Sequence, residues 1–337
     1  MRAGTAAVRP WGSIEWVIEK LPKRTWSLLG CLSPEERSLG LWEYLRSSAK
    51  QDKSLLIKIK PSSARYALEF ADRLQLRLDK LRQIGQPSEG ITELELFATD
   101  AEIVQIVDQF ASACGPHVIL DLSCFPKRFF FPFVKRLLAK ARIETLVGTY
   151  TIPEQYFAGV LAEDHLGFAH LPLFGPSQFP GSKVEMVIVT AGFMKLGLPE
   201  LLEPYKTGVA IRTILPFPPG LPAYHRNWEF IREMQQTLPP GLAPPIRVEA
   251  YDCADAFHHF VQLTKKGTKN TIFAPFGPKP LSLAICLFAS LARHAVYYTQ
   301  PTVYNPDYSS GIKRWKKELA AYAYTLRING NNTYSIT

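Results

Sequence analysis

Apolar runs and amphipathic segments alternate along the first half of the chain, in the order that a parallel α/β sheet requires. Residues 118–122 (VILDL) are apolar on both faces of an extended chain, as expected for a strand that helices cover on both sides. Short connections between strands and helices predict parallel, right-handed crossovers. The strands expected in this half are 25–32, 54–59, 91–98, 118–122 and 143–149, and the expected helices are 33–48, 64–84, 99–113 and 127–141.

The second half of the chain repeats this pattern. Residues 118–127 read VILDLSCFPK and residues 270–279 read NTIFAPFGPK, each an apolar strand, a turn with proline, and Pro-Lys before a helical segment. Lys127 and Lys279 are therefore separated by 279 − 127 = 152 positions. The same offset relates two further pairs of residues, Asp100 with Asp252 and Tyr156 with Tyr308.

This repetition predicts an α/β protein made of two duplicated Rossmann-like modules with mainly parallel sheets. The first module covers residues 1–160 and the second covers 184–311. Residues 161–183 are richer in Pro, Gly and His, and we interpret them as a linker. A looser echo relates SLGLWE at 38–43 to KLGLPE at 195–200. The second module is expected to have strands at 184–190, 209–215, 246–250 and 270–273, with helices at 255–265 and after Lys279.

The two ends of the chain show strand-like alternation of apolar and polar residues. Residues 12–21 alternate and predict an edge strand. Residues 320–328 also alternate, and Asn329-Gly330 follows them as a hairpin turn. We therefore expect a β-hairpin within a C-terminal extension, residues 312–337, that pairs with 12–21 at an edge of the sheet.

Composition favours an anionic partner. The 337 residues carry a formal net charge of +9, which suits a nucleotide, a nucleic acid or an acidic protein without choosing among them. The five cysteines are scattered and contain no CxxC pair, so we expect neither a disulfide framework nor a metal site. No apolar run approaches the roughly 18 residues of a membrane span, so a cytoplasmic protein without a membrane partner is expected.

Ligands of open α/β sheets bind beyond the carboxyl ends of the strands, and polar residues gather at those ends here. Lys127 and Lys279 each begin a helix, although the helix dipole favours acidic residues there. Either they bind an anionic ligand, or they pair with carboxylates such as Asp100 and Asp252. The candidate ligand-binding residues are Ser123, Lys127, Arg128, Thr190, Gly277 and Lys279.

Catalysis has weaker candidates. Asp121 ends a buried strand in the first module only, because Phe273 occupies the matching position of the second. It either caps its own turn or takes part in acid-base or metal chemistry. The chain contains neither GxGxxG nor GxxxxGK[ST], so no dinucleotide or P-loop site, and no cofactor, is expected. The catalytic candidates are Asp100, Asp121 and Asp252.

The tandem modules, with polar strand ends and no dinucleotide motif, resemble the CARF and SAVED sensor domains of prokaryotic antiviral defence. Residues 267–269 (GTK), the strand and Gly-Pro-Lys turn that follow, and the helical segment PLSLAICLFASLA are similar to the end of such domains. The resemblance implies binding of cyclic or linear oligonucleotide messengers at a twofold or pseudo-twofold interface. Such sensors usually carry an appended effector, which this sequence lacks, so the resemblance also implies output through a partner protein.

Three functions follow from these observations. The first is a non-enzymatic sensor or adaptor that binds a nucleotide, oligonucleotide or nucleic acid and acts through a partner protein, as the duplicated lysines suggest. The second is a phosphoesterase or nucleotide-processing enzyme that uses Asp100, Asp121 and Asp252. The third is a structural subunit of a larger complex, for which the aromatic residues and prolines would form recognition loops.

Overall fold

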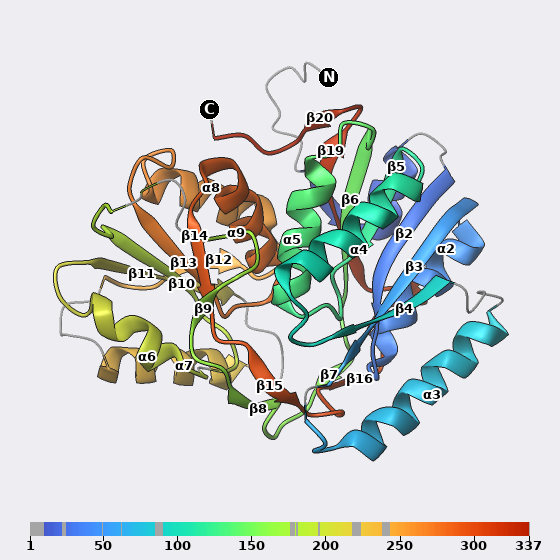
Figure 1. Cartoon of the computed structure of the whole chain (residues 1–337), viewed down its shortest axis with the longest axis horizontal. Coiled ribbons are helices and arrows are strands. Elements are labelled where there is room, and N and C mark those ends of the chain that lie inside the picture. Colours follow the sequence, from blue (N-terminus) through green and yellow to red (C-terminus); the bar gives the residue numbers. More distant parts are fainter. Residues whose placement is uncertain are drawn as a thin grey trace.

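The structure is a computed structural model that describes residues 10–21, 25–48, 50–61, 63–84, 90–175, 179, 181–194, 196–217, 224–237 and 243–336. Two separate sheets with helices around them form two modules, and we call the part built on the N-terminal sheet module 1 and the other module 2 (Figure 1). The fold is mixed α/β with mainly parallel sheets, which confirms the predicted fold class.

The sheet of module 1 has a parallel centre and an antiparallel side. From one edge to the other, its strands follow the order β1-β19-β6-β5-β2-β3-β4, with β20 paired to β19. The parallel strands are β2 (Thr25–Leu32), β3 (Lys50–Lys60), β4 (Ile91–Glu95), β5 (His117–Asp121) and β6 (Thr145–Thr151). The helical elements of this module are α1 (Ile14–Lys20), η1 (Glu36–Leu39), α2 (Gly40–Ser48), α3 (Ala67–Gln83), α4 (Asp100–Ala113) and α5 (Lys127–Leu138).

The sheet of module 2 has the same strand order. It runs β12-β11-β10-β13-β14-β9, so that in both modules the parallel strands lie in the order third, second, first, fourth, fifth. Its strands are β10 (Met186–Thr190), β11 (Ala210–Phe217), β12 (Ile246–Glu249), β13 (Thr271–Pro275), β14 (Ala295–Tyr298) and the antiparallel β9 (Ala169–His170). Its helical elements are α6 (Leu198–Leu202), η3 (Glu203–Tyr205), α7 (Tyr224–Thr237), α8 (Cys253–Leu263) and α9 (Lys279–Ala292).

This order creates one switch point in each sheet: the second and third strands are added on one side of the first strand, and the fourth and fifth on its other side. The switch points lie between β2 and β5 in module 1 and between β10 and β13 in module 2. The helices that follow β5 and β13 are α5 and α9, and these pack against each other at the centre of the molecule (Figure 1).

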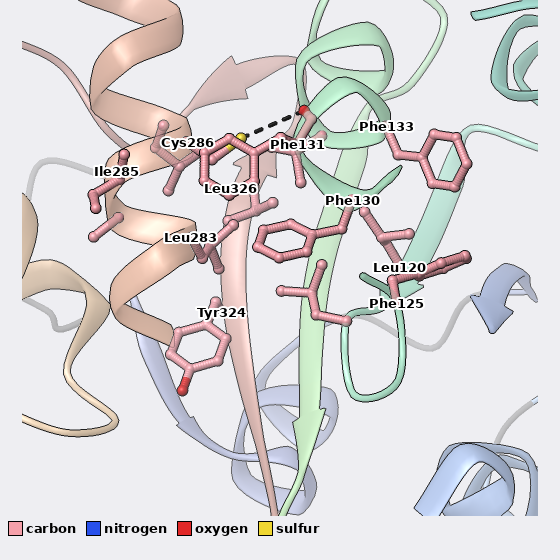
Figure 2. Close-up of a cluster of buried hydrophobic side chains, with 14 of the residues drawn as sticks. Leu120, Phe125, Phe130, Phe131, Phe133, Leu283, Ile285, Cys286, Tyr324 and Leu326 are labelled. Atoms are coloured by element: carbon pink, nitrogen blue, oxygen red, sulfur yellow. Dashed lines mark hydrogen bonds between the residues drawn. The ribbon is translucent and has the colours of Figure 1, made fainter. Parts of the chain in front are cut away.

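The core between the modules consists of side chains from α5, α9 and the C-terminal strand β19 (Ala321–Ile328) (Figure 2). Phe130 and Phe131 of α5 and Leu283 of α9 are fully buried, and the Cys286 thiol lies 3.5 Å from the Phe131 carbonyl oxygen that accepts its hydrogen bond. Each such aromatic side chain contributes roughly 1.5–3 kcal/mol by leaving water. The two modules therefore share one continuous core.

The residues between the modules belong to the sheets as well. Within 161–183, β8 (Ala162–His165) pairs with β15 (Pro301–Tyr304), and β9 extends the sheet of module 2. Shorter ladders join β7 (Gln155–Tyr156) to β16 (Ser309–Ser310) and β17 (Arg314–Trp315) to β18 (Glu318–Leu319). The chain thus crosses repeatedly between the modules on the side of β7 and β8.

The ends of the chain agree with the prediction only in part. The C-terminal hairpin is present, because β19 pairs with β20 (Asn331–Asn332), and β19 also pairs with β1 (Trp11–Ser13). The prediction of a strand at 12–21 is mostly wrong, because Ile14–Lys20 form the helix α1. The Ser13 side chain caps the start of this helix by accepting a hydrogen bond from the Trp16 N–H. The apolar residues Ile14 and Val17 are three positions apart, a spacing that places both on the buried face of a helix. The sequence of this segment therefore suits a helix as well as a strand.

Candidate functional site

A cavity of about 220 Å³ lies between the modules, where the carboxyl edges of both sheets converge. Residues at or just beyond the end of every parallel strand line it, which is the position where open α/β sheets bind ligands. From module 1 these include Leu32, Lys60, Leu96, Cys124 and Tyr150, and from module 2 Gly192, Pro216, Ala250, Phe276 and Thr299. The cavity therefore lies at both switch points at once.

Lys127 and Lys279 reach across this cavity in opposite directions. The Lys127 ammonium group donates to the carbonyl oxygens of Pro275 and, at 3.1 Å, Gly277, both in the turn after β13. The Lys279 ammonium group donates at 2.6 Å to the carbonyl oxygen of Ser123, in the turn after β5. Ser123 and Pro275 are themselves 152 positions apart, so they occupy equivalent positions in the two modules. Lys127 therefore contacts in module 2 the position that Lys279 contacts in module 1. We call this pair of contacts the lysine exchange.

The lysine exchange leaves two ammonium groups without a carboxylate partner among the described residues. Burial lowers the pKa of Lys127 well below its usual range, and the neighbouring Lys279 lowers it further. Burial likewise lowers the pKa of Lys279, with a contribution from the Arg37 charge. Both side chains keep part of their surface open to the cavity. An anion bound there would favour the charged ammonium forms.

The helix termini add to this positive field. Lys127 begins α5 and Lys279 begins α9, with Pro126 and Pro278 at the N-caps. Neither helix has an acidic residue in its first turn or a side chain that caps it. The positive ends of both helix dipoles therefore face the cavity, and no acidic residue in the first turn of either helix compensates them.

A third cation, Arg37, lies in η1, directly after β2, and is 2% exposed. Its guanidinium group binds the Glu35 carboxylate through Nε at 2.9 Å and Nη2 at 2.8 Å, and donates to the Tyr150 hydroxyl at 3.3 Å. Burial alone would lower the pKa of Arg37, but Glu35 and the nearby tyrosines raise it above the usual value. Glu35 in turn accepts a hydrogen bond from the Ser309 hydroxyl. This buried pair is fixed at one end of the cavity.

Tyrosine side chains form much of the remaining wall. The hydroxyl groups of Tyr150 and Tyr156 are 2.7 Å apart, and the Arg37 guanidinium lies over both rings. The Tyr156 and Tyr308 rings meet edge to face with their centroids 6.2 Å apart, so this matched pair both packs together and lines the cavity. The Lys127 ammonium lies 4.8 Å from the centroid of the Tyr298 ring. Aromatic faces beside cations suit a ligand with a flat ring and a negative charge.

The predicted ligand-binding residues separate into two groups. Lys127, Gly277 and Lys279 line the cavity. Ser123 and Thr190 are fully buried and hold the turns: the Thr151 N–H donates to the Ser123 hydroxyl at 2.8 Å, and the Gly277 N–H donates to that of Thr190 at 3.0 Å.

Arg128 lies outside the cavity lining. Its Nη2 donates to the Ala98 carbonyl oxygen at 2.6 Å, and the same nitrogen lies 4.0 Å from the carboxylate of Asp100. The alternative that Lys127 and Lys279 pair with Asp100 and Asp252 is not found. Carbonyl oxygens of the opposite module take the place of those carboxylates.

The three candidate catalytic aspartates do not line the cavity. Asp100 is half-exposed at the start of α4, and Asp252 caps α8 by accepting a hydrogen bond from the Asp255 N–H at 2.8 Å. Asp121 is buried and accepts hydrogen bonds from the Ser123 N–H at 3.1 Å and from the Ser123 and Thr149 hydroxyls. Within the part of the chain that the structure describes, no group of three acidic, His or Cys residues could hold a metal ion.

Two thiols in the cavity wall are poor nucleophiles. Cys31 and Cys124 both line it, and burial raises the pKa of each thiol well above the usual value. A thiol acts as a nucleophile in its thiolate form, which burial in apolar surroundings disfavours. Neither thiol is therefore suited to nucleophilic chemistry in this cavity.

Sequence reasoning did not identify Glu35 and Arg37. They stand in SPEERS, directly after an apolar strand, and neither of the two residues has a charged counterpart in module 2. A search based on repetition excludes a residue that occurs in only one half. The available signal was their position: the loop after the first strand of a doubly wound sheet borders the switch point.

Comparisons with known proteins give no family. No protein-family model and no curated protein matches the chain. A solved structure of a functionally unknown protein from Pseudomonas aeruginosa is 10% identical, with a TM-score of 0.25, over 82% of this chain and 92% of that one. The methyltransferase domain of a bacterial Hen1 protein is 16% identical, with a TM-score of 0.23, over 44% of this chain and 70% of that one. Neither likeness carries an argument at such TM-scores. Among the described residues, no helix is long and apolar enough to cross a membrane.

Proposed function

We propose that the protein is a binding protein for a nucleotide-type anion, which it takes into the cavity between its modules. The observation that carries this proposal is the lysine exchange. It holds two ammonium groups, without carboxylate partners in the described part of the chain, at the converging carboxyl edges of both sheets. Buried cations of this kind are costly unless an anion compensates them.

Two features favour a nucleotide over a simple inorganic anion. The cavity wall is rich in tyrosine rings, on which a base can stack, and these rings lie beside the cations. The positive ends of α5 and α9 also point at the space where a phosphate would lie.

Binding is favoured over hydrolysis by the position of the acidic residues. Asp100, Asp121 and Asp252 lie outside the cavity lining, and Glu35, which lines it, is paired with Arg37. The protein partner that the sequence suggests stays a prediction, as does a role in prokaryotic antiviral defence.

The test is calorimetric titration with mononucleotides, linear oligonucleotides and cyclic oligonucleotides. The wild-type protein should bind at least one of these ligands, and the double variant Lys127→Ala/Lys279→Ala should bind it at least about 100-fold more weakly. That loss corresponds to roughly 2.7 kcal/mol, a modest value for removing two charge-assisted contacts.

Lys135→Ala is the matched control. Lys135 lies on the same helix, donates to the carbonyl oxygen of Leu173 and is partly buried, but it does not line the cavity. It should bind with wild-type affinity. If the double variant keeps full affinity, or if no nucleotide binds the wild type, the proposal is wrong. Thermal unfolding of each variant separates lost binding from lost folding.

A further inference from the structure

The two halves of the cavity differ chemically at one pair of equivalent positions. In the register that matches residues 38–43 with 195–200, Glu35 corresponds to Gly192 and Arg37 to Met194. All four residues line the cavity, each in the loop after the first parallel strand of its sheet. One half therefore presents a guanidinium group paired with a carboxylate where the other presents a thioether and a glycine.

A ligand with twofold symmetry would meet these two surfaces with identical groups. A phosphate placed against Arg37 can receive charge-assisted hydrogen bonds, whereas the same phosphate against Met194 would lose water without gaining a donor. The cavity therefore discriminates against a symmetric ligand and favours one whose charge is concentrated at a single end.

The Arg37 end can still donate to a ligand. A guanidinium group has five N–H donors, and the contacts to Glu35 and Tyr150 use three nitrogen atoms once each. The nearby Tyr156 ring and the two ammonium groups of the lysine exchange complete a cationic end of the cavity.

The wall that module 2 contributes is mainly aromatic. Phe193, Phe276 and Tyr298 line it, and the rings of Phe276 and Tyr298 have centroids 5.6 Å apart. The Phe193 ring meets Tyr156 edge to face at 5.2 Å, so this wall adjoins the tyrosine beside Arg37, and the Lys127 ammonium lies over the Tyr298 ring. A base can stack there at a worth of roughly 1–3 kcal/mol.

We infer that the ligand is a single nucleotide with a terminal phosphate, and not a cyclic oligonucleotide. Its phosphate lies between Arg37 and the lysine exchange, and its base lies against Phe193, Phe276 and Tyr298. This inference rests on the proposed function, because it specifies the ligand of the same cavity.

The test compares adenosine, AMP, ATP, the linear dinucleotide pApA and cyclic di-AMP by calorimetric titration, and repeats the monophosphate series with guanine, cytosine and uracil. We expect AMP or ATP, or the equivalent nucleotide of another base, to bind the wild type at least about 10-fold more tightly than cyclic di-AMP, a difference of about 1.4 kcal/mol. The nucleoside without phosphate should bind weakest.

Two variants test the asymmetry itself. Arg37→Met replaces the guanidinium group by the thioether that the other half carries, and should weaken phosphate-bearing mononucleotides at least about 10-fold while leaving the nucleoside unchanged. Because Arg37 pairs with Glu35, the double variant Glu35→Gln/Arg37→Met, which removes both charges, is measured beside it. Met194→Arg lies in the other half at a partly exposed position and should raise the affinity for cyclic di-AMP relative to AMP.

The outcomes separate this inference from the proposed function. If cyclic di-AMP binds the wild type as tightly as every mononucleotide, or if Arg37→Met weakens nucleoside and nucleotide equally, the inference is overturned and the proposed function stands. If no nucleotide of any kind binds, both are overturned. A folded wild type with a clear preference for one mononucleotide supports both.

Discussion

Single residues in this protein show how burial decides between a catalytic and a structural role. Asp121 ends β5, is 1% exposed, and accepts its hydrogen bonds from Ser123 and Thr149. Burial raises the pKa of Asp121 to about 6, although the hydrogen bonds and Lys279 oppose that effect. The carboxylate therefore caps its own turn, and its charge at neutral pH destabilises the folded state.

This assignment gives Asp121→Asn a characteristic pH dependence. The carboxyl pKa is higher in the folded state, so wild-type stability should fall as the pH rises from about 4 to about 6 and then level off. The variant lacks this group. Its free energy of unfolding relative to wild type should therefore increase by about 2.4 kcal/mol between pH 4 and pH 7, for a carboxyl pKa of 3.8 in the unfolded chain and about 6 in the folded state. Urea denaturation at both pH values measures it, and a constant difference would contradict the assignment.

The lysines were predictable from the sequence, and the arginine was not. Lys127 and Lys279 were found because both modules begin a helix with Pro-Lys, and both were expected at strand ends. Their partners were not predictable, since carbonyl oxygens of a distant turn leave no trace in a sequence. Arg37 was missed because its equivalent, Met194, has a different chemistry. Repetition detects the residues that the two halves share, whereas the specificity that we propose depends on a residue that they do not share.

At the level of elements, the loops at the two switch points determine the shape of the cavity. Gly192 follows β10 in module 2, and a Cβ atom added to it would lie 2.0 Å from the Phe276 carbonyl oxygen in the loop after β13. The Phe276 carbonyl oxygen belongs to the backbone, so it cannot move away from an added methyl group as the end of a flexible side chain can. Gly192 is therefore required for the two loops to approach each other.

Gly192→Ala should force these loops apart. We expect the free energy of unfolding to fall by about 1–3 kcal/mol, the usual effect of adding a methyl group to a packed site. Gly167→Ala is the control, because a Cβ there meets nothing within 4 Å, and it should change stability by less than about 0.5 kcal/mol. Chemical denaturation of both variants gives the comparison, and equal stabilities would show that the loops tolerate separation.

The elements themselves were mostly predictable. Strands such as β5 and β10 are buried along their whole length except for His117, and continuous apolar runs of that kind are typical of central parallel strands. The helix α1 was missed because a short segment with apolar residues at alternate positions can also place Ile14 and Val17 on one helical face. In so short a segment, the Ser13 cap and not the periodicity distinguishes the two structures.

At the level of the whole molecule, β19 ties the C-terminal end of the chain to module 1. It lies between β1 and β6 in the sheet, so module 1 is completed by residues that follow module 2. The Tyr324 hydroxyl also donates at 3.0 Å to the carbonyl oxygen of Tyr251, in the loop after β12. Such long-range pairing could not be derived from the alternation of residues 320–328 alone.

Removing residues 311–337 should therefore unfold module 1 as well as the C-terminal extension. We expect the truncated chain to lose its cooperative thermal transition, because β6 would expose a side that β19 covers and β1 would lose its partner. A shorter truncation that ends at Ile328 and removes β20 should keep a cooperative transition. Circular dichroism on heating measures both. An unchanged transition in the longer truncation would show that the C-terminal strand is dispensable.

The lysine exchange has the form of an isologous contact, the kind made in a homodimer when residue i of one subunit meets residue j of the other, and j meets i. Here the two equivalent modules lie in one polypeptide. In a homodimer, any mutation at the symmetry axis appears twice. A single chain is free of that constraint, so one half of the shared site can carry the buried Glu35–Arg37 ion pair where the other half has Gly192 and Met194. The ligand that we propose, with a phosphate at one end and a base at the other, matches this difference between the halves.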